Sequence, residues 1–210
     1  MDRSEVGEPG EKQAVTTRVS VGESGVTAPV SPTSQLGRAV ERFNRRALRV
    51  VRPGSRWLMA SVKLGFIMKA AAVVVGVAVL ATQSALGYEV KDVSRPSDNI
   101  PELVFLLLVL APLLETTLIW LIYASTRRWL GLTGFVLASA VLAYAGHYTP
   151  NSVPIAIALV FSAMSYQYVS FRDEIGASRA FAGVAVSHAV YNGFGALILS
   201  LEVILERHLL

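Results

Sequence analysis

The sequence predicts an all-α integral membrane protein with about five transmembrane helices and a disordered N-terminal tail. Hydrophobic residues make up 53% of the 210 residues and charged residues only 16%, which is far more apolar than an average soluble domain. Five apolar segments each approach the ~20 residues that a helix needs to cross a bilayer. The net charge of +4 comes from the N-terminal quarter of the chain.

The N-terminal region divides into two parts. Residues 1–37 are rich in Gly, Ser, Thr, Glu and Pro, so we predict a disordered tail. Residues 38–56 form a basic juxtamembrane segment, with seven arginines and a single acid, Glu41. Apolar residues recur there at helical spacing, which fits an amphipathic helix on the membrane surface; a disordered basic anchor fits equally well. In either form, Arg38–Arg56 is expected to bind anionic lipid headgroups, not nucleic acid.

The five apolar segments lie at about residues 64–83, 100–124, 129–147, 153–171 and 180–203. We assign residues 57–99 to the first transmembrane helix and an outer loop. Residues 100–205 are assigned to a helical membrane domain. The odd number of segments and the lack of internal repeats argue against a transporter built from two equal halves.

Arginine positions predict the orientation. Three basic clusters fall on one side of the five segments: Arg38–Arg56, Arg127 with Arg128, and Arg172 with Arg179. Cytoplasmic loops carry an excess of Lys and Arg, so this side is predicted to be cytoplasmic. The N-terminus would then be cytoplasmic and the C-terminus outside, and the expected location is a bacterial cell membrane.

A single carboxylate, Glu115, stands near the middle of the apolar run Leu107–Tyr123. An ionised group there costs roughly 2.5–3.5 kcal/mol on insertion scales, so a functional role with a partner elsewhere in the bundle is expected. Candidate partners are His147, at the end of the third segment, and His188, in the fifth. Asn192 follows His188 by one helical turn and shares its face.

The last segment also carries a stripe of small residues at four-residue intervals, Ala185, Ala189 and Gly193. Small residues let the backbones of two membrane helices approach closely. The stripe therefore predicts that this helix lies inside the bundle, with a neighbouring helix packed against these three residues.

These side chains limit the chemistry to hydrolysis. A carboxylate in a low-dielectric pocket can act as general base on water while a histidine shares the proton. A second histidine and an amide can donate hydrogen bonds to an oxyanion. Alternatively, Glu115, His147 and His188 are a plausible zinc ligand set with one position left for water. The cofactor stays open, with metal-free chemistry slightly favoured. The chain has no cysteine, which excludes disulfides and a cysteine nucleophile.

Three motifs resemble those of the CAAX protease and bacteriocin-processing (CPBP) intramembrane proteases, which include the type II CAAX prenyl endopeptidases. Ala111-Pro112 leads into Glu115–Trp120, which resembles the first motif of that family. Val141–His147 is similar to the second motif, and His188–Asn192 matches the third. The resemblance covers about residues 100–200. It departs at Thr116 and Trp120, where the family has a second glutamate and an arginine.

The resemblance implies an intramembrane endopeptidase. Glu115 would activate water with help from His147, while His188 and Asn192 would bind the oxyanion. The substrate would be a protein or peptide in the membrane, lipidated or leader-bearing. The departures at Thr116 and Trp120 leave a second hypothesis, a non-catalytic relative that acts as a membrane scaffold or immunity factor. A proton-coupled transporter with Glu115 as carrier is a third.

The depths of the candidate residues conflict. Hydropathy sets Glu115 near mid-membrane, about 22 Å along its helix. His147, however, falls at the outer end of its segment. The two can meet if one segment tilts, if the other is displaced inward, or if the bundle thins around a water-filled cavity. The sequence therefore predicts a wet pocket between the second, third and fifth segments.

Overall fold

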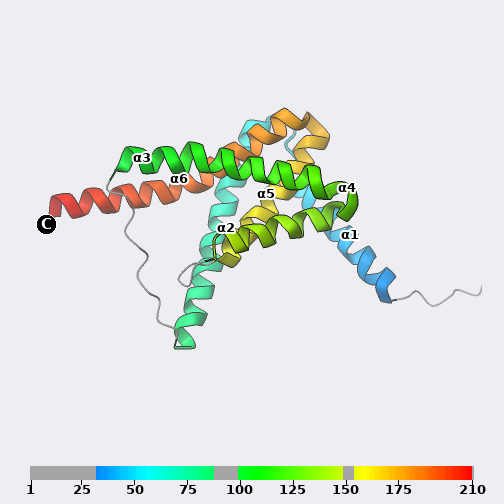
Figure 1. The fold of residues 1–210 in the computed structure, drawn as a ribbon, viewed down its shortest axis with the longest axis horizontal. Coiled ribbons are helices and arrows are strands. Elements are labelled where there is room, and N and C mark those ends of the chain that lie inside the picture. The colour runs from blue at the N-terminus through cyan, green and yellow to red at the C-terminus, as the bar shows by residue number, and fades with distance from the viewer. Residues whose placement is uncertain (1–31, 88–98, 149–153, 210) are drawn as a thin grey trace, which may run out of the picture.

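The computed structural model describes residues 32–87, 99–148 and 154–209 (Figure 1). Within these ranges every regular element is a helix, as the sequence predicts: α1 (Pro32–Val50), α2 (Trp57–Ala85), α3 (Ile100–Phe105), the π-helix η1 (Leu106–Leu110), α4 (Ala111–Gly146), α5 (Pro154–Ile175) and α6 (Ala177–Leu209). Four helical stretches are long and apolar enough to cross a membrane: Trp57–Ala85, Ile100–Gly146, Pro154–Ile175 and Ala177–Leu201. The all-α fold is therefore confirmed.

One of these four stretches contains two of the five predicted segments. Within α4, Gly131 has φ 65° and ψ −167°, and the chain doubles back there (Figure 1). Positive φ is easily adopted only by glycine, so this residue permits the reversal. The returning limb, residues 132–146, is about 22 Å long. It is thus shorter than the ~30 Å hydrocarbon core of a bilayer.

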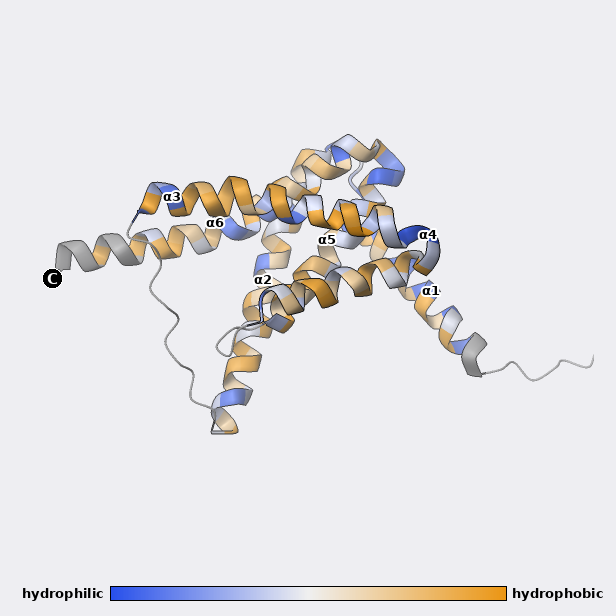
Figure 2. Ribbon diagram, in the orientation of Figure 1, coloured by the Kyte–Doolittle hydropathy of each residue, from blue (hydrophilic) through white to orange (hydrophobic). Residues whose placement is uncertain are grey.

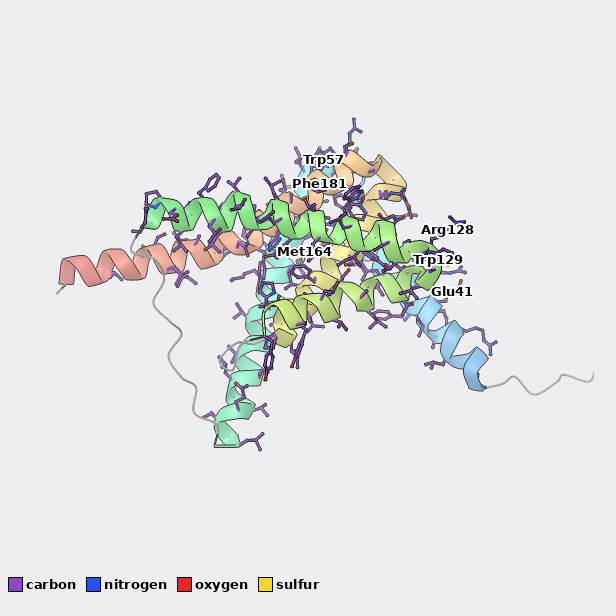
Figure 3. All side chains as sticks on the ribbon, in the orientation of Figure 1. Glu41, Trp57, Arg128, Trp129, Met164 and Phe181 are labelled. Atoms are coloured by element: carbon purple, nitrogen blue, oxygen red, sulfur yellow. The ribbon has the colours of Figure 1, made fainter. Side chains whose placement is uncertain are left out.

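The core is centred on α5, which contacts α1, α2, α4 and α6. Large buried side chains form it, and Met164 lies in its middle (Figure 3). The other large, fully buried apolar residues are Phe135, Phe161, Tyr168, Phe171 and Ile119. Because α5 is surrounded on several sides, it is the element against which the functional helices are positioned.

The outer surface is strongly apolar. Orange, hydrophobic residues cover the outer faces of α3, α4 and α2 in Figure 2, and many large apolar side chains there are exposed, among them Val73, Val74, Leu113, Leu114 and Leu121. Soluble monomers rarely expose apolar patches larger than a few hundred Å². The surface is therefore compatible with an integral membrane protein whose outer faces contact lipid.

The basic segment forms a helix, which is one of the two alternatives that its sequence left open. Helix α1 begins at Pro32, inside the stretch predicted to be a tail, and ends at Val50. Asn44 fixes it to the bundle, because its Nδ2 donates to Thr133 Oγ1 at 2.9 Å and its Oδ1 accepts from the Tyr166 hydroxyl. The rest of the predicted tail, residues 1–31, lies outside the described residues.

Basic groups gather at one end of the bundle. Arg128 and Trp129 lie at the reversal of α4, with the guanidinium carbon of Arg128 5.5 Å from the Trp129 ring (Figure 3). Arg172, near the end of α5, donates to the Tyr123 hydroxyl at 2.6 Å. Arg52, just after α1, lies 4.0 Å from Glu174. Arginines therefore lie at the reversal of α4, near the end of α5 and just after α1.

Helices α2 and α6 cross closely, through residues other than the predicted stripe. A Cβ atom at Gly65 would lie 2.5 Å from the Ser187 carbonyl oxygen, so only glycine fits there. The Ser187 hydroxyl donates to the Ser61 carbonyl at 2.8 Å and accepts from Gln167 at 2.7 Å. Ala185, Ala189 and Gly193 are only partly buried. As the stripe predicts, α6 lies inside the bundle and packs against α2, α4, α5 and η1. Within the stripe, a Cβ atom at Gly193 would lie 3.5 Å from Leu108 Cδ2, but the closest crossing, with α2, is made by Gly65 and Ser187.

We expect Gly65→Ala to lower the free energy of unfolding. The added methyl group must displace the Ser187 backbone, and overpacking of this kind costs about 1–3 kcal/mol. Gly76→Ala, in the same helix but with no atom within 4 Å of the added carbon, is the matched control and should not destabilise the protein. Unfolding of the purified protein in detergent by added SDS measures both. Equal stability of the two variants would contradict the close crossing.

Candidate active site

Glu115, His147 and His188 converge from three parts of the chain. Glu115 lies on the first limb of α4, His147 directly after the second limb, and His188 on α6. The distance from His147 Nε2 to Glu115 Oε1 is 3.9 Å, and that from His188 Nε2 to Glu115 Oε2 is 3.3 Å. All three line one partly open cavity of about 310 Å³, together with Asn192. The sequence-predicted residues therefore meet at one place.

The reversal at Gly131 explains how Glu115 and His147 come to the same depth. Glu115 precedes Gly131 by sixteen residues and His147 follows it by sixteen. In two antiparallel helical limbs, equal separations from the turn bring residues to the same level, here about 24 Å from the turn. The conflict between their depths disappears because the returning limb is short, which places its end inside the bundle.

His147 has a defined ring orientation. Its Nδ1 lies 3.0 Å from the Ala143 carbonyl oxygen, which can only accept, so Nδ1 carries the hydrogen. In the neutral ring, Nε2 then presents a lone pair toward Glu115. The 3.9 Å separation is too long for a direct hydrogen bond and suits two groups that share a water molecule. The side chain is 39% exposed, so water can reach it.

His188 has the opposite environment. Its side chain is 3% exposed, and its Nε2 is close enough to donate to the Glu115 carboxylate. Its Nδ1 has no hydrogen-bond partner among the described residues. Phe161 lies beside both imidazoles, with ring centroids 6.1 Å from His147 and 6.3 Å from His188. One histidine is thus held dry at the base of the cavity while the other lies at its wet rim.

Asn192 satisfies a backbone carbonyl that Pro112 leaves without a donor. In the π-helix η1 each carbonyl bonds to the amide five residues later, as the Ala111 amide does with Leu106. The carbonyl of Leu107 would need the amide of residue 112, and proline has none. Asn192 Nδ2 donates to Leu107 O at 3.0 Å instead. One of its two N–H groups therefore joins α6 to η1, which leaves only the second for a substrate.

Lys69 is a cavity residue that the sequence analysis missed. It lies on α2, outside the region that resembles the CPBP proteases, and it lines the cavity with Glu115 and His188. Its Nζ atom lies 4.9 Å from the centre of the Tyr191 ring. A lysine inside an apolar span is as costly as a glutamate, so the argument that singled out Glu115 could also have identified Lys69.

The two positions that depart from the family motif are occupied differently. Thr116 is fully buried, and its Oγ1 has no hydrogen-bond partner among the described residues. Trp120 is 43% exposed. The CPBP proteases have a glutamate and an arginine at these two positions. This protein has the small, buried Thr116 and the large, outward-facing Trp120 instead.

The cavity does not present a ready metal site. Among the described residues, no three His, Asp or Glu side chains are arranged to share one metal ion. Glu115, His147 and His188 as placed thus do not fit zinc, for which structural and catalytic sites hold three or four ligands at tetrahedral positions. We derive no catalytic step through a metal.

We expect Asn192→Ala to lower the free energy of unfolding by about 1 kcal/mol, because the Leu107 carbonyl loses its donor. In a Pro112→Ala background the loss should be smaller, since residue 112 then carries an N–H that can take over. A double-mutant cycle in detergent and SDS measures this coupling. If Asn192→Ala costs the same in both backgrounds, Asn192 does not compensate for Pro112.

Comparisons of the whole chain with protein-family models, with curated proteins and with solved structures find no match. Two features of the chain therefore indicate its function. One is the convergence of Glu115 with His147 and His188 around a cavity. The other is the motif resemblance of the segments that carry them.

Proposed function

We propose that the protein is an intramembrane endopeptidase that hydrolyses a peptide bond with water activated by Glu115. The observation that carries the proposal is the position of the Glu115 carboxylate, 3.9 Å from one histidine and 3.3 Å from another, in a cavity of about 310 Å³. A carboxylate and two imidazoles from separate parts of the chain are rarely brought together in an apolar bundle without a function.

The two oxygens of Glu115 have different tasks in this mechanism. His188 holds Oε2, so Oε1 faces His147 and the exposed side of the cavity. A water molecule between Oε1 and His147 Nε2 gives its proton to the carboxylate while its oxygen attacks the peptide carbonyl carbon. The resulting oxyanion accepts from the second N–H of Asn192. His188 keeps its single N–H on Oε2 and so positions Glu115, instead of binding the oxyanion. The C–N bond then breaks, and the leaving amine takes the proton from Glu115.

The substrate is expected to enter from the membrane. The cavity lies between α2, α4, α5 and α6, whose outer faces are apolar. A membrane-associated protein, lipidated or carrying a leader peptide, is the substrate class that the motif resemblance implies. The substrate segment that contains the peptide bond must be in an extended conformation to reach Glu115. A segment near a membrane anchor adopts this conformation more easily than a folded domain does.

Anionic lipid headgroups are proposed to bind α1 and the residues that follow it. All seven arginines between Arg38 and Arg56 are exposed. They share one end of the bundle with Arg128 and Arg172. By the positive-inside rule, this end faces the cytoplasm. Each Lys or Arg close to an anionic leaflet contributes about 1 kcal/mol to membrane binding, so the helix would lie on the lipid surface.

A non-catalytic membrane scaffold is the second candidate. It is favoured by one observation, the buried Thr116 and outward Trp120 at the positions of the family's ion pair. Replacing both members of a buried pair together can cost little, so the fold and Glu115 can persist without it. The two candidates differ in whether any cleavage depends on Glu115.

We expect Glu115→Gln to reduce cleavage of membrane proteins at least about 100-fold, because the amide cannot take a proton from water. His147→Ala and His188→Ala should act in the same direction. Mass spectrometry of new protein N-termini, in membranes of cells that make each variant, measures the effect. Immunoblots of the same membranes establish equal amounts of protein.

Glu102→Gln is the matched control. Glu102 is an exposed carboxylate on α3 that accepts a hydrogen bond from Asn99 at 3.1 Å, away from the cavity. This variant should produce the wild-type set of N-termini. If Glu115→Gln also produces the wild-type set, the protein is not a protease and the scaffold candidate is preferred.

A further inference from the structure

The cavity contains a positive charge that the proposed hydrolysis does not use. Lys69 lies twelve residues into α2, about 18 Å from its start, well inside a hydrocarbon core of about 30 Å. A charge at this depth is costly and is usually retained for a function with a specific partner. Among the described residues, no carboxylate lies within 4.0 Å of the Lys69 ammonium, although Glu115 lines the same cavity.

The Lys69 side chain lies against α6. One turn before Lys69, Gly65 brings α2 against α6. The ammonium reaches the backbone of α6 at Gly195, where a Cβ atom would lie in ordinary contact, 3.9 Å from Nζ. The ring of Tyr191 lies 4.9 Å away and stabilises the cation through its π face. A ring face carries no net charge, so the Lys69 ammonium can still donate its N–H groups to an anion.

We propose that Lys69 binds a carboxylate of the peptide substrate and so positions its backbone at Glu115. The inference rests on the proposed function and names a feature of the substrate. A lysine ammonium is a compact point charge that pairs well with a carboxylate. A lipid phosphate is the other anion available in a membrane, but headgroups lie at the bilayer surface and Lys69 is far from it. The shared cavity with Glu115 favours the peptide.

Binding can be measured without catalysis. The full-length Glu115→Gln protein, in nanodiscs of phosphatidylcholine, is titrated with N-palmitoyl-tetra-alanine and with its C-terminal amide. The free acid should bind about tenfold more tightly than the amide, as expected for one hydrogen-bonded charge pair. An amide probe with one internal glutamate tells whether a side-chain carboxylate can replace the chain terminus.

Three variants of this protein separate Lys69 from general electrostatics. Lys69→Met should remove the preference for the acid, and Lys69→Arg should keep it. Lys63→Met, which removes an exposed lysine of the same helix outside the cavity, should also keep it. Met is apolar and suits a membrane helix, so the first variant should insert and fold normally.

Several results would overturn the inference. Equal binding of acid and amide, or no binding of either, would do so, as would an acid preference that survives Lys69→Met. If phosphatidylglycerol added to the nanodiscs abolishes the preference, Lys69 binds lipid phosphate instead. None of these results depends on cleavage, so a failure of the inference is distinct from a failure of the proposed hydrolysis.

Discussion

The reversal of α4 at Gly131 is the constraint on which the candidate active site depends. It makes one long apolar stretch into two antiparallel limbs and sets Glu115 opposite His147. The returning limb is short, so without neighbouring helices its polar end would be exposed to lipid. Here that end faces α5 and α6, where Phe161 and His188 receive it. The returning limb is too short to cross the membrane by itself. Because it is short, its end lies inside the bundle, where it helps to form the cavity.

The second constraint is the helix distortion that precedes Glu115. Pro112 removes a backbone donor at a depth where water is scarce, so the carbonyl that loses it needs another donor from the protein. The chain responds locally with the π-helix η1 and at long range with Asn192. Since His188 is one turn before Asn192, the hydrogen bond that repairs the helix also fixes the register of α6. The position of His188 against Glu115 thus depends in part on Pro112, through the hydrogen bond of Asn192.

Much of the fold and the main residues of the candidate site could be predicted, because both depend on the free-energy cost of placing polar groups in a membrane. The hydropathy of the sequence shows this cost directly. Apolar length predicted the helices, and isolated polar residues within them predicted Glu115 and His188. The pairing of limbs could not be predicted so well, since hydropathy does not show where a helix stops within the bilayer. The stripe at Ala185 predicted that α6 lies inside the bundle but did not identify its closest crossing, because several small residues lie on α6 and only packing decides which of them meets α2. Lys69 was not predicted, although an ammonium inside an apolar helix carries the same kind of cost as the Glu115 carboxylate.

The cavity contains two side chains of opposite charge. Glu115 and Lys69 carry opposite charges and line the same space, yet they lie more than 4.0 Å apart. Opposite charges in one low-dielectric cavity stabilise each other, which lowers the cost of burying both. A direct ion pair would engage the carboxylate oxygen that must accept a proton and the ammonium that could hold a substrate. Because the two groups share the cavity without a direct ion pair, each keeps its oxygen or N–H groups available while the mutual stabilisation is retained.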